Sequence, residues 1–321
     1  MTILLTGATG LIGRALTQLL LDQGVQPRVV TRRPHRALEI FDNRVTAFEW
    51  HPRTEPLPPI ALDGVERVIH LMGEPLYGPL TREKRARIVA SRRIGTKRLV
   101  EALGRTRVHL IAASSAAVYG FDEGPPLTET TAVRRPKDKL ALALLGCEEA
   151  AEHLRENGSI VTLVRLGPVI APGAFPEPLW QLFHRRAAWR EAHPEAAIPA
   201  IDQVDAVALL AWLALSRPLP GPVHAVAPEP LRSVDLGNLL GQAAPRRVRA
   251  GLPRWLLRRQ VGVLADLVHS RQRVIPQRAL DAGFVFSRPD PLESVRAVLA
   301  QHTAQPAVRR GSLLGAVLQR S

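Results

Sequence analysis

Three glycines near the start of the chain have the spacing of a loop that binds phosphate. Gly7, Gly10 and Gly13 lie in the segment TGATGLIG, between a short apolar run and a pattern of helical spacing. Gly7 would permit a tight turn, Gly10 would let the backbone approach a pyrophosphate, and Gly13 would let the helix pack closely on the strand. Free N–H groups at the start of that helix would face the phosphates. A purely structural turn is the alternative, but the strand–loop–helix context favours dinucleotide binding.

The end of the next apolar run indicates which dinucleotide is bound. An acidic side chain there would hold a ribose 2′-hydroxyl and repel a 2′-phosphate. The run ends in VVTRR, with Thr31 and Arg32 in that place. The Thr31 hydroxyl can hydrogen-bond a phosphate, and the Arg32 guanidinium can hold it in a bidentate fork. Arginine is common throughout the chain, but the position of Arg32 favours a function, and we therefore expect NADP(H).

Alternating apolar runs and helical patterns place these residues in a parallel α/β sheet. The apolar runs predict strands at 2–7, 27–33, 45–50, 65–73, 107–115 and 159–167. The helical patterns between them lie at 11–24, 82–103 and 139–157. Repeated β-α-β units with apolar strands imply a parallel sheet covered by helices on both faces. We predict a Rossmann-type doubly wound domain over residues 1–170, with ligands bound beyond the carboxyl ends of its strands.

The second half of the chain has a different character. Strands become rare, and helical patterns follow one another at 203–216, 233–243, 253–268 and 291–301. We expect residues 203–228 to return to the Rossmann domain, with one strand at 222–228. Residues 171–302 are predicted to form a smaller, mainly helical substrate region, and residues 303–321 a basic flexible tail.

Composition narrows the functional classes. The chain has 321 residues and a formal net charge of +14, but its basic residues are nearly all arginines in scattered pairs. Such scatter indicates compositional bias, so we expect no specific nucleic-acid partner. Cys147 is the only cysteine, which rules out an internal disulfide, and we expect no metal site. Neither a signal-peptide pattern nor a run of about 20 apolar residues occurs, so we expect a cytoplasmic protein without a membrane span.

Several motifs together resemble the short-chain dehydrogenase/reductase superfamily, in its extended or atypical branch. More narrowly, the chain resembles the sugar-nucleotide-epimerase-like family, which has a C-terminal helical domain of unknown function. The resemblance covers roughly residues 1–301. It is carried by ILLTGATGLIGRAL, VIHLMGE, REKRARIVASRRIGTKRLVEAL, AIDQVDAV and RVIPQRALDAGFVF. In these motifs, His70 stands where the family has asparagine, Met72 where it has alanine, and Asp202 where it has histidine.

The resemblance implies a set of cofactor-binding residues and an epimerase-like oxidoreductase that binds NADP(H). The set extends the glycine loop to the next strand end and to the long helix. Its members are Gly7, Thr9, Gly10, Leu11, Ile12, Gly13, Thr31, Arg32, Leu71, Met72, Gly73 and Arg92.

The catalytic residues that the resemblance implies are incomplete. Ser115, at the end of an apolar run, would hydrogen-bond a substrate hydroxyl or carbonyl. In the superfamily a tyrosine then moves the proton, and a lysine four residues later lowers the pKa of that tyrosine. No Tyr-x-x-x-Lys occurs in this chain. Alignment places the tyrosine position on Leu140 or Ala141, and the lysine position on Leu144 or Leu145.

Two residues are candidates for the missing acid or base. Glu74 would lie on the loop beside the nicotinamide, although it could equally be a helix cap or pair with Arg82 or Arg85. Tyr119 is the other candidate, but we favour its interpretation as a packed aromatic residue at a strand exit. Lys139 is expected to be a solvated residue in the first turn of its helix.

The sequence alone identifies neither the substrate nor the activity. The family has a glycine-rich stretch that is replaced here by residues 172–200, which have one glycine and many bulky side chains. His184, Arg185 and Arg186 in this stretch could bind an anion, although an exposed basic helix face is the simpler interpretation. One hypothesis is an atypical oxidoreductase or epimerase acting on a nucleotide sugar or another carbonyl compound. The other is a non-catalytic NADP(H)-binding sensor or scaffold.

Overall fold

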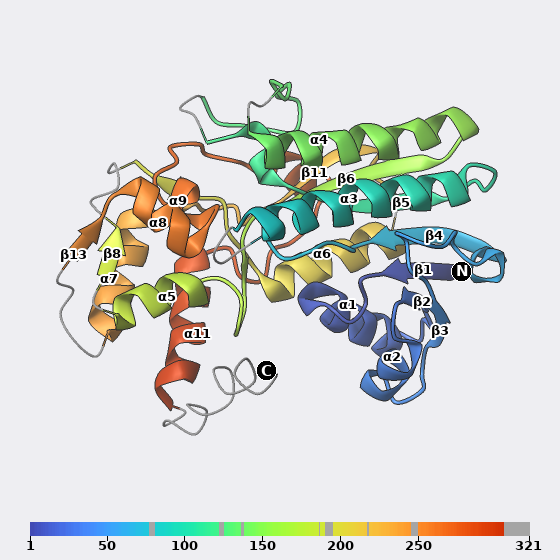
Figure 1. Ribbon diagram of the computed structural model, residues 1–321, viewed down its shortest axis with the longest axis horizontal. Helices are drawn as coiled ribbons and strands as arrows, with labels where there is room; N and C mark the ends of the chain where they lie inside the picture. Colours follow the sequence, from blue (N-terminus) through green and yellow to red (C-terminus); the bar gives the residue numbers. More distant parts are fainter. Residues whose placement is uncertain are drawn as a thin grey trace.

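Seven parallel strands form the central sheet of the protein. The computed structural model describes residues 1–76, 81–121, 125–135, 138–185, 187–189, 195–216, 218–244 and 250–304. Within these residues the strand order is β11-β6-β5-β4-β1-β2-β3 (Figure 1). The strands are β1 (Thr2–Thr6), β2 (Arg28–Thr31), β3 (Thr46–Glu49), β4 (Val65–His70), β5 (His109–Ser115), β6 (Ile160–Leu166) and β11 (Gly221–Ala225). The order reverses between β1 and β4, and parallel sheets bind ligands at such a switch point.

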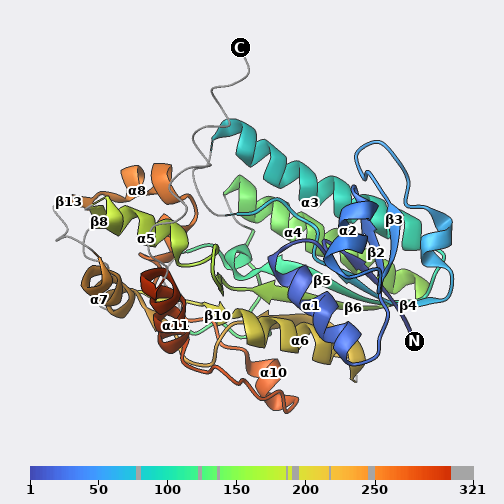
Figure 2. The same ribbon diagram turned by 90° about the horizontal axis from the view of Figure 1, so that it is seen from below.

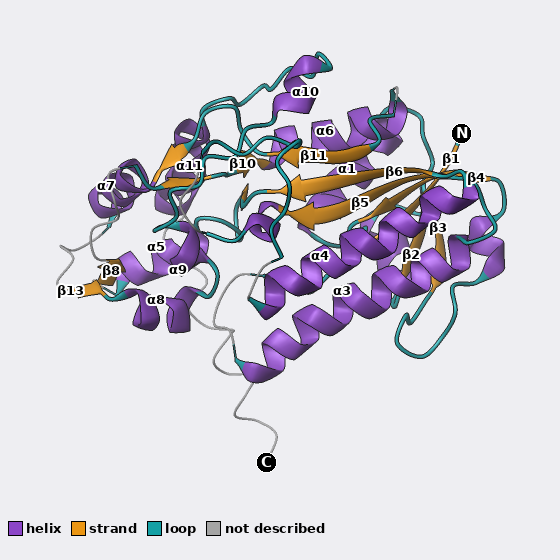
Figure 3. Cartoon of the chain, turned by 90° about the horizontal axis from the view of Figure 1, so that it is seen from above, coloured by secondary structure: helices purple, strands orange, loops and turns teal. Residues whose placement is uncertain are grey.

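Helices cover both faces of this sheet, as Figures 2 and 3 show. One face carries α1 (Leu11–Asp22), α2 (Pro34–Ile40) and α6 (Gln203–Leu215), and the other carries α3 (Arg82–Leu103) and α4 (Lys139–Glu152). The cause is the alternation of side chains along each strand. Ile3 and Leu5 pack in the cluster that includes α1 and α6, whereas Leu4 packs in the cluster that includes α3. This arrangement confirms the predicted Rossmann-type fold.

A smaller, mainly helical region follows the sheet and has its own apolar core. Its helices are α5 (Glu177–His184), α7 (Ser233–Ala243), α8 (Arg254–Val261), α9 (Leu264–Leu267) and α11 (Pro291–Ala304). Helix α10 (Gln277–Asp281) lies between them in the chain but packs against the sheet, with Ala279 in the same cluster as α1 and α6. Its short strands are β7 (Val169–Ile170), β8 (Ala187–Trp189), β9 (Ala197–Ile198), β10 (Ile201–Asp202), β12 (Leu231–Arg232) and β13 (Ala250–Leu252). They pair as β7 with β10, β8 with β13 and β9 with β12. Phe175, Trp180 and Leu257 are among the buried residues of this second core.

Two predicted helices differ from those in the structure. The segment 253–268 forms two helices, α8 and α9, because Gly262 between them has φ of +67°, outside helical geometry. The segment 139–157 is α-helical only to Glu152, and continues as the 3-10 helix η3 (His153–Asn157) before Gly158 at φ of +84°. Two further 3-10 turns are η1 (Pro59–Leu62) and η2 (Ala116–Tyr119).

The described part of the chain contains no helix with the length and apolarity to cross a bilayer. The predicted tail lies almost entirely outside the described residues, which end at residue 304 in α11.

Candidate functional site

The glycine loop connects β1 to α1 at the switch point of the sheet. Gly7 has φ of +76°, and a Cβ atom there would lie 2.8 Å from the carbonyl carbon of Leu71. A Cβ atom on Gly13 would overlap the carbonyl oxygen of Gly7. The Gly10 N–H donates to that same oxygen at 3.0 Å and closes the turn. Positions 7 and 13 therefore exclude any side chain.

The start of α1 offers backbone donors beside this loop. Gly10 is the N-cap and provides no side chain to cap the helix. The first helical hydrogen bond runs from the Arg14 N–H to the Gly10 carbonyl at 2.9 Å, so the N–H groups of Leu11, Ile12 and Gly13 have no acceptor within the helix. Such a set of N–H groups, at the positive end of a helix dipole, suits a phosphate.

A hollow of about 740 Å³ borders the loop. Thr9, Gly10 and Leu11 line it, together with Arg14 from the first turns of α1. Arg14 is absent from the predicted set of cofactor-binding residues, although it follows the last glycine of the loop directly. Its exposed side chain places a cation beside the N–H groups at the start of α1, in addition to Arg32 at the end of β2.

Thr31 and Arg32 lie at the end of β2, next to β1 in the sheet. The Thr31 hydroxyl oxygen accepts a hydrogen bond from the Arg33 N–H at 3.3 Å, which leaves its proton available for a ligand. Arg32 is exposed and forms neither a hydrogen bond nor an ion pair with the described residues. Its guanidinium is therefore available to an anion.

The end of β4 is fixed by a buried histidine. His70 lies between two threonines, with Nδ1 2.8 Å from the Thr6 hydroxyl and Nε2 3.1 Å from the Thr96 hydroxyl. The Thr6 hydroxyl also accepts a hydrogen bond from the Met72 N–H at 3.3 Å. Burial, and then the nearby charge of Arg92, lower the pKa of His70 to about 4. The ring is therefore neutral at neutral pH and holds the backbone that leads to Gly73.

Gly73 and Glu74 are held by α3. A Cβ atom on Gly73 would lie 3.1 Å from the guanidinium carbon of Arg92, so this side chain lies directly against the glycine. Arg92 donates to the Glu74 carbonyl at 2.8 Å, and the Glu74 N–H donates to the Ser91 hydroxyl at 3.0 Å. Both backbone groups of Glu74 are thus fixed by consecutive residues of one helix.

The Glu74 carboxylate is about one-third exposed and lies 3.5 Å from Nε of Arg87. One interpretation of Glu74 from the sequence was an ion pair with Arg82 or Arg85. Arg87 is the partner because it lies one helical turn before Ser91, on the side of α3 that faces Glu74.

Ser115 ends β5, and β5 lies beside β4 in the sheet. Its half-buried hydroxyl oxygen accepts a hydrogen bond from the Ala117 N–H at 3.3 Å and caps η2. The neighbouring Ser114 points elsewhere, and donates to Glu148 at 2.6 Å. The Ser115 hydroxyl therefore still has its proton to donate, on the same edge of the sheet as Gly73 and Glu74.

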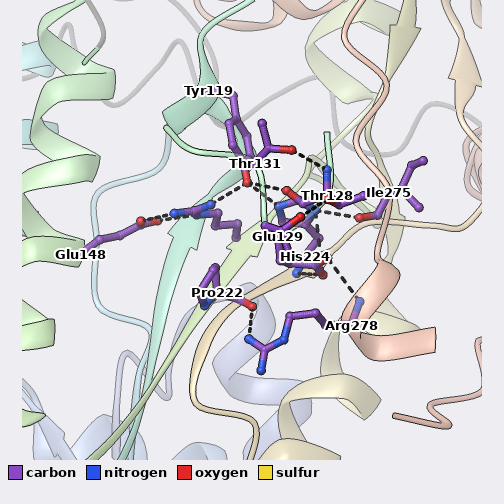
Figure 4. A network of polar contacts seen from close by, with 11 residues as sticks. Tyr119, Thr128, Glu129, Thr131, Glu148, Pro222, His224, Ile275 and Arg278 are labelled. Carbon is purple, nitrogen blue, oxygen red and sulfur yellow. Dashed lines mark hydrogen bonds and ion pairs between the residues drawn. The ribbon is translucent and has the colours of Figure 1, made fainter. Parts of the chain in front are cut away.

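Tyr119 belongs to a buried polar network, shown in Figure 4. Arg165 donates to the Tyr119 oxygen at 2.6 Å and forms two hydrogen bonds with Glu148, at 3.0 and 2.7 Å. His224 Nδ1 donates to the Ile275 carbonyl at 2.7 Å, so Nε2 accepts the Tyr119 proton at 2.8 Å. Burial is the main reason that the pKa of Tyr119 is raised. Both hydrogen-bonding functions of this hydroxyl are engaged inside the protein.

Glu129 extends the network to the C-terminal region. Its carboxylate accepts hydrogen bonds from the His224 N–H at 2.9 Å and the Arg278 N–H at 3.2 Å. The Arg278 side chain donates in turn to the Pro222 carbonyl at 2.6 Å (Figure 4). The loop after β5 is therefore linked to β11 and to the start of α10.

The positions aligned with the superfamily's tyrosine and lysine are apolar in the structure as in the sequence. Leu140 and Ala141 line a hollow at the start of α4, and Leu144 is buried. Lys139 is exposed in the first turn, after the N-cap Asp138. Cys147 is half-buried on the same helix, and burial is the first cause of its raised pKa.

The basic segment after α5 is only partly described. His184 is exposed, and its ring packs edge-on against Trp180 with 4.3 Å between ring centroids. Arg185 is exposed, and Arg186 lies outside the described residues.

The parallel sheet, the glycine loop and its place at the switch point define a Rossmann-type protein of the short-chain dehydrogenase/reductase kind. A family model described as the NAD dependent epimerase/dehydratase family matches residues 3–204, and the chain belongs to this family. A second model, a domain of unknown function (DUF1731), matches residues 252–298. The resemblance drawn from the sequence is confirmed by both matches.

Similar proteins cover nearly the whole chain. The epimerase family protein YfhF of Bacillus subtilis is 24% identical over 294 residues, 90% of this chain and 95% of that protein. The crystal structure of human epimerase family protein SDR39U1 (isoform 2) with NADPH has a TM-score of 0.74 at 22% identity, over 94% of this chain and 99% of that one. UDP-glucose 4-epimerase from Thermotoga maritima, solved with UDP-glucose, has a TM-score of 0.74 at 19% identity, over 95% and 100%. These structural likenesses show a shared fold.

Proposed function

We propose that this protein binds NADP(H) and is an epimerase-like oxidoreductase for a nucleotide sugar or another small carbonyl compound. The observation that carries the proposal is the end of β2, where an exposed Arg32 takes the place of an acid. Arg14 adds a second cation beside the phosphate loop. The human relative solved with NADPH supports the choice of cofactor. Structures of similar fold that were solved with NAD and either UDP-glucose or UDP-glucuronic acid support the substrate class.

When bound, the cofactor supplies or accepts a hydride, and the protein has to handle the proton. The Ser115 hydroxyl can donate a hydrogen bond to a substrate oxygen, since only its acceptor function is engaged. The Glu74 carboxyl is the better acid or base, because its backbone is fixed and its carboxylate is partly exposed. Tyr119 would first have to break its bonds with Arg165 and His224.

A second function is favoured by the start of α4. The apolar side chains of Leu140 and Leu144 cannot carry a proton, and Leu144 is buried. A protein that binds NADP(H) to sense its redox ratio, or to hold a partner, has no need of a tyrosine–lysine pair.

The test is turnover of NADPH by the purified protein with a panel of carbonyl compounds and nucleotide sugars. We expect a rate below the ~10 s⁻¹ typical of enzymes, because the pair is missing. In Ser115→Ala the rate should fall while the dissociation constant of NADPH stays the same. Loss of an acid or base costs about 10²–10⁴-fold, which we expect for Glu74→Gln.

Tyr119→Phe is the matched comparison, and it should keep the wild-type rate in the folded protein. An unchanged rate in Ser115→Ala would remove Ser115 from the catalytic residues. Binding of NADPH without turnover on any member of the panel would favour the sensor.

A further inference from the structure

A carboxylate lies beside the end of β2, where we expect the 2′-phosphate to bind. Glu49 is the last residue of β3 and the register partner of Thr31, the last residue of β2. The Trp50 N–H donates to the Thr31 carbonyl at 3.0 Å, so the two strands stay paired to their ends. Neighbouring strands lie about 4.8 Å apart, and register partners direct their side chains to the same face of the sheet. The Glu49 side chain is therefore long enough to reach across to Thr31 and to Arg32, which follows it.

A carboxylate in this place opposes a 2′-phosphate in two ways. It repels the phosphate, and in water a charge about 6 Å away changes the affinity for an anion roughly threefold per unit of anionic charge. It also competes with the phosphate for the Arg32 guanidinium, because both anions fit the same bidentate fork. Arg32 is nevertheless exposed and without an ion pair among the described residues. Another group must therefore hold the Glu49 carboxylate.

That group is His51, two residues further along the chain. Nε2 of His51 lies 3.1 Å from Oε1 of Glu49. An ionised carboxylate only accepts hydrogen bonds, so Nε2 carries the proton and donates the hydrogen bond. The bond draws the carboxylate toward the loop that follows β3, and so away from β2. The next cation of that loop, Arg53, lines a hollow beside α3 and forms no ion pair with the described residues.

The pair of His51 and Glu49 does little for stability, because both side chains are exposed to water. The exposed fractions are 40% for His51 and 63% for Glu49. Ion pairs in such places contribute little to the free energy of unfolding. Beside the end of β2, the charge of Glu49 therefore matters for a ligand and not for the fold.

We propose that His51 is a positioning residue for cofactor selection. Its ring keeps the Glu49 carboxylate away from Arg32, and the Arg32 guanidinium stays available to the 2′-phosphate of NADP(H). The inference rests on the proposed NADP(H) function and adds how the preference for the phosphate is maintained with an acid next to the site. Loss of the His51 ring frees Glu49 to pair with Arg32 and to repel the phosphate. NADH has no 2′-phosphate, so its binding does not depend on this pair.

The experiment titrates NADPH and NADH into the full chain by calorimetry. His51→Ala should weaken NADPH binding about fivefold and leave NADH binding unchanged, because only NADPH brings a phosphate to the freed carboxylate. The double variant Glu49→Gln, His51→Ala should restore the wild-type affinity for NADPH. The matched control is His153→Ala, which breaks another exposed pair, with 3.3 Å between His153 Nδ1 and Glu156 Oε1 in η3. This control should bind both nucleotides like the wild type.

Three results would overturn the inference. Equal weakening of both nucleotides in His51→Ala would mean that His51 contacts the part that they share. An unchanged NADPH affinity in His51→Ala would mean that Glu49 does not compete for Arg32. Failure of the double variant to regain affinity would mean that the loss does not act through Glu49. The proposed function fails differently, since the wild type itself would then bind NADPH no more tightly than NADH, and the inference would fall with it.

Discussion

The glycine loop and the network around Tyr119 lie beyond neighbouring parts of one sheet, yet they are built in opposite ways. The loop is made of backbone from seven consecutive positions, 7–13, and its helix start has N–H groups without acceptors in the helix. The network is made of side chains from distant segments, and Tyr119, Arg165 and His224 satisfy one another. The glycine loop therefore has free hydrogen-bond donors for a ligand, whereas the polar groups around Tyr119 are already hydrogen-bonded within the protein.

The two regions differ because phosphate binding and proton transfer need different groups. A phosphate can be held by backbone groups that hardly depend on side-chain identity. Proton transfer needs a particular side chain with a free position. The tyrosine nearest to Ser115 among the described residues is Tyr119, and its hydroxyl stabilises the fold. The substitutions below test each side of this contrast.

Breaking the network should have the largest effect. Arg165→Leu leaves the buried Glu148 carboxylate without its cation, and removal of one partner of a buried pair costs about 3–5 kcal/mol of unfolding free energy. Urea unfolding monitored by circular dichroism measures the loss. Replacing both residues by methionine is the control, and should cost much less. If Arg165→Leu were as stable as the wild type, the ion pair of Arg165 with Glu148 would not support the fold.

On the cofactor side, His70 should make stability depend on pH. Its pKa is about 4 in the folded protein against 6.5 for an unperturbed histidine, so the unfolded chain binds the proton more readily between these values. The contribution of neutral His70 to the unfolding free energy is therefore present in full above about pH 6.5. It is lost as the pH falls toward 4, and the loss is about 3 kcal/mol for this residue. His109 has the same lowered pKa through burial and adds its own loss.

His70→Asn separates these contributions, since asparagine can still hydrogen-bond the threonines but does not titrate. The decrease in unfolding free energy between pH 6.5 and pH 4 should be smaller in this variant by the roughly 3 kcal/mol that His70 contributes. The same pH profile in variant and wild type would show that His70 is not the group that titrates.

The smallest effect is expected at the end of β2, beside the glycine loop. Arg32→Ala would remove the charged contact that we propose for the 2′-phosphate, so NADPH binding should weaken by about 1.5–3 kcal/mol and NADH binding should stay unchanged. Calorimetric titration of both nucleotides measures this preference. Arg33→Ala is the neighbouring control, because its backbone and not its side chain bonds Thr31. Equal affinities of the wild type for the two nucleotides would contradict the NADP(H) assignment.

The sequence predicted what depends on neighbours along the chain. Gly7, Gly10 and Gly13 identify their loop by their spacing between an apolar strand and a helix, and repeated β-α-β units with apolar strands predict both covered faces of the sheet. The sequence could not predict the contacts among Glu148, Arg165 and His224. Each of them lies in a different element, and nothing in their spacing links them. For a related reason, the ion pair with Arg82 or Arg85 that was one alternative for Glu74 is not the one that forms: the rotation of α3 about its axis, and not sequence distance, presents Arg87.

The contacts of Glu129 and Arg278 also determine how the outermost strand of the sheet meets its surroundings. An unpaired strand edge is a template for pairing with another chain, and leads to aggregation. On β11, Pro222 has no N–H to offer, its carbonyl is taken by Arg278, and the His224 N–H is taken by Glu129. Together with Glu129, the segment from 273 to 278 thus blocks strand addition at this border. A protein truncated before residue 273 would expose the edge of β11. We expect such a protein to become insoluble, even where its cofactor-binding loop is intact.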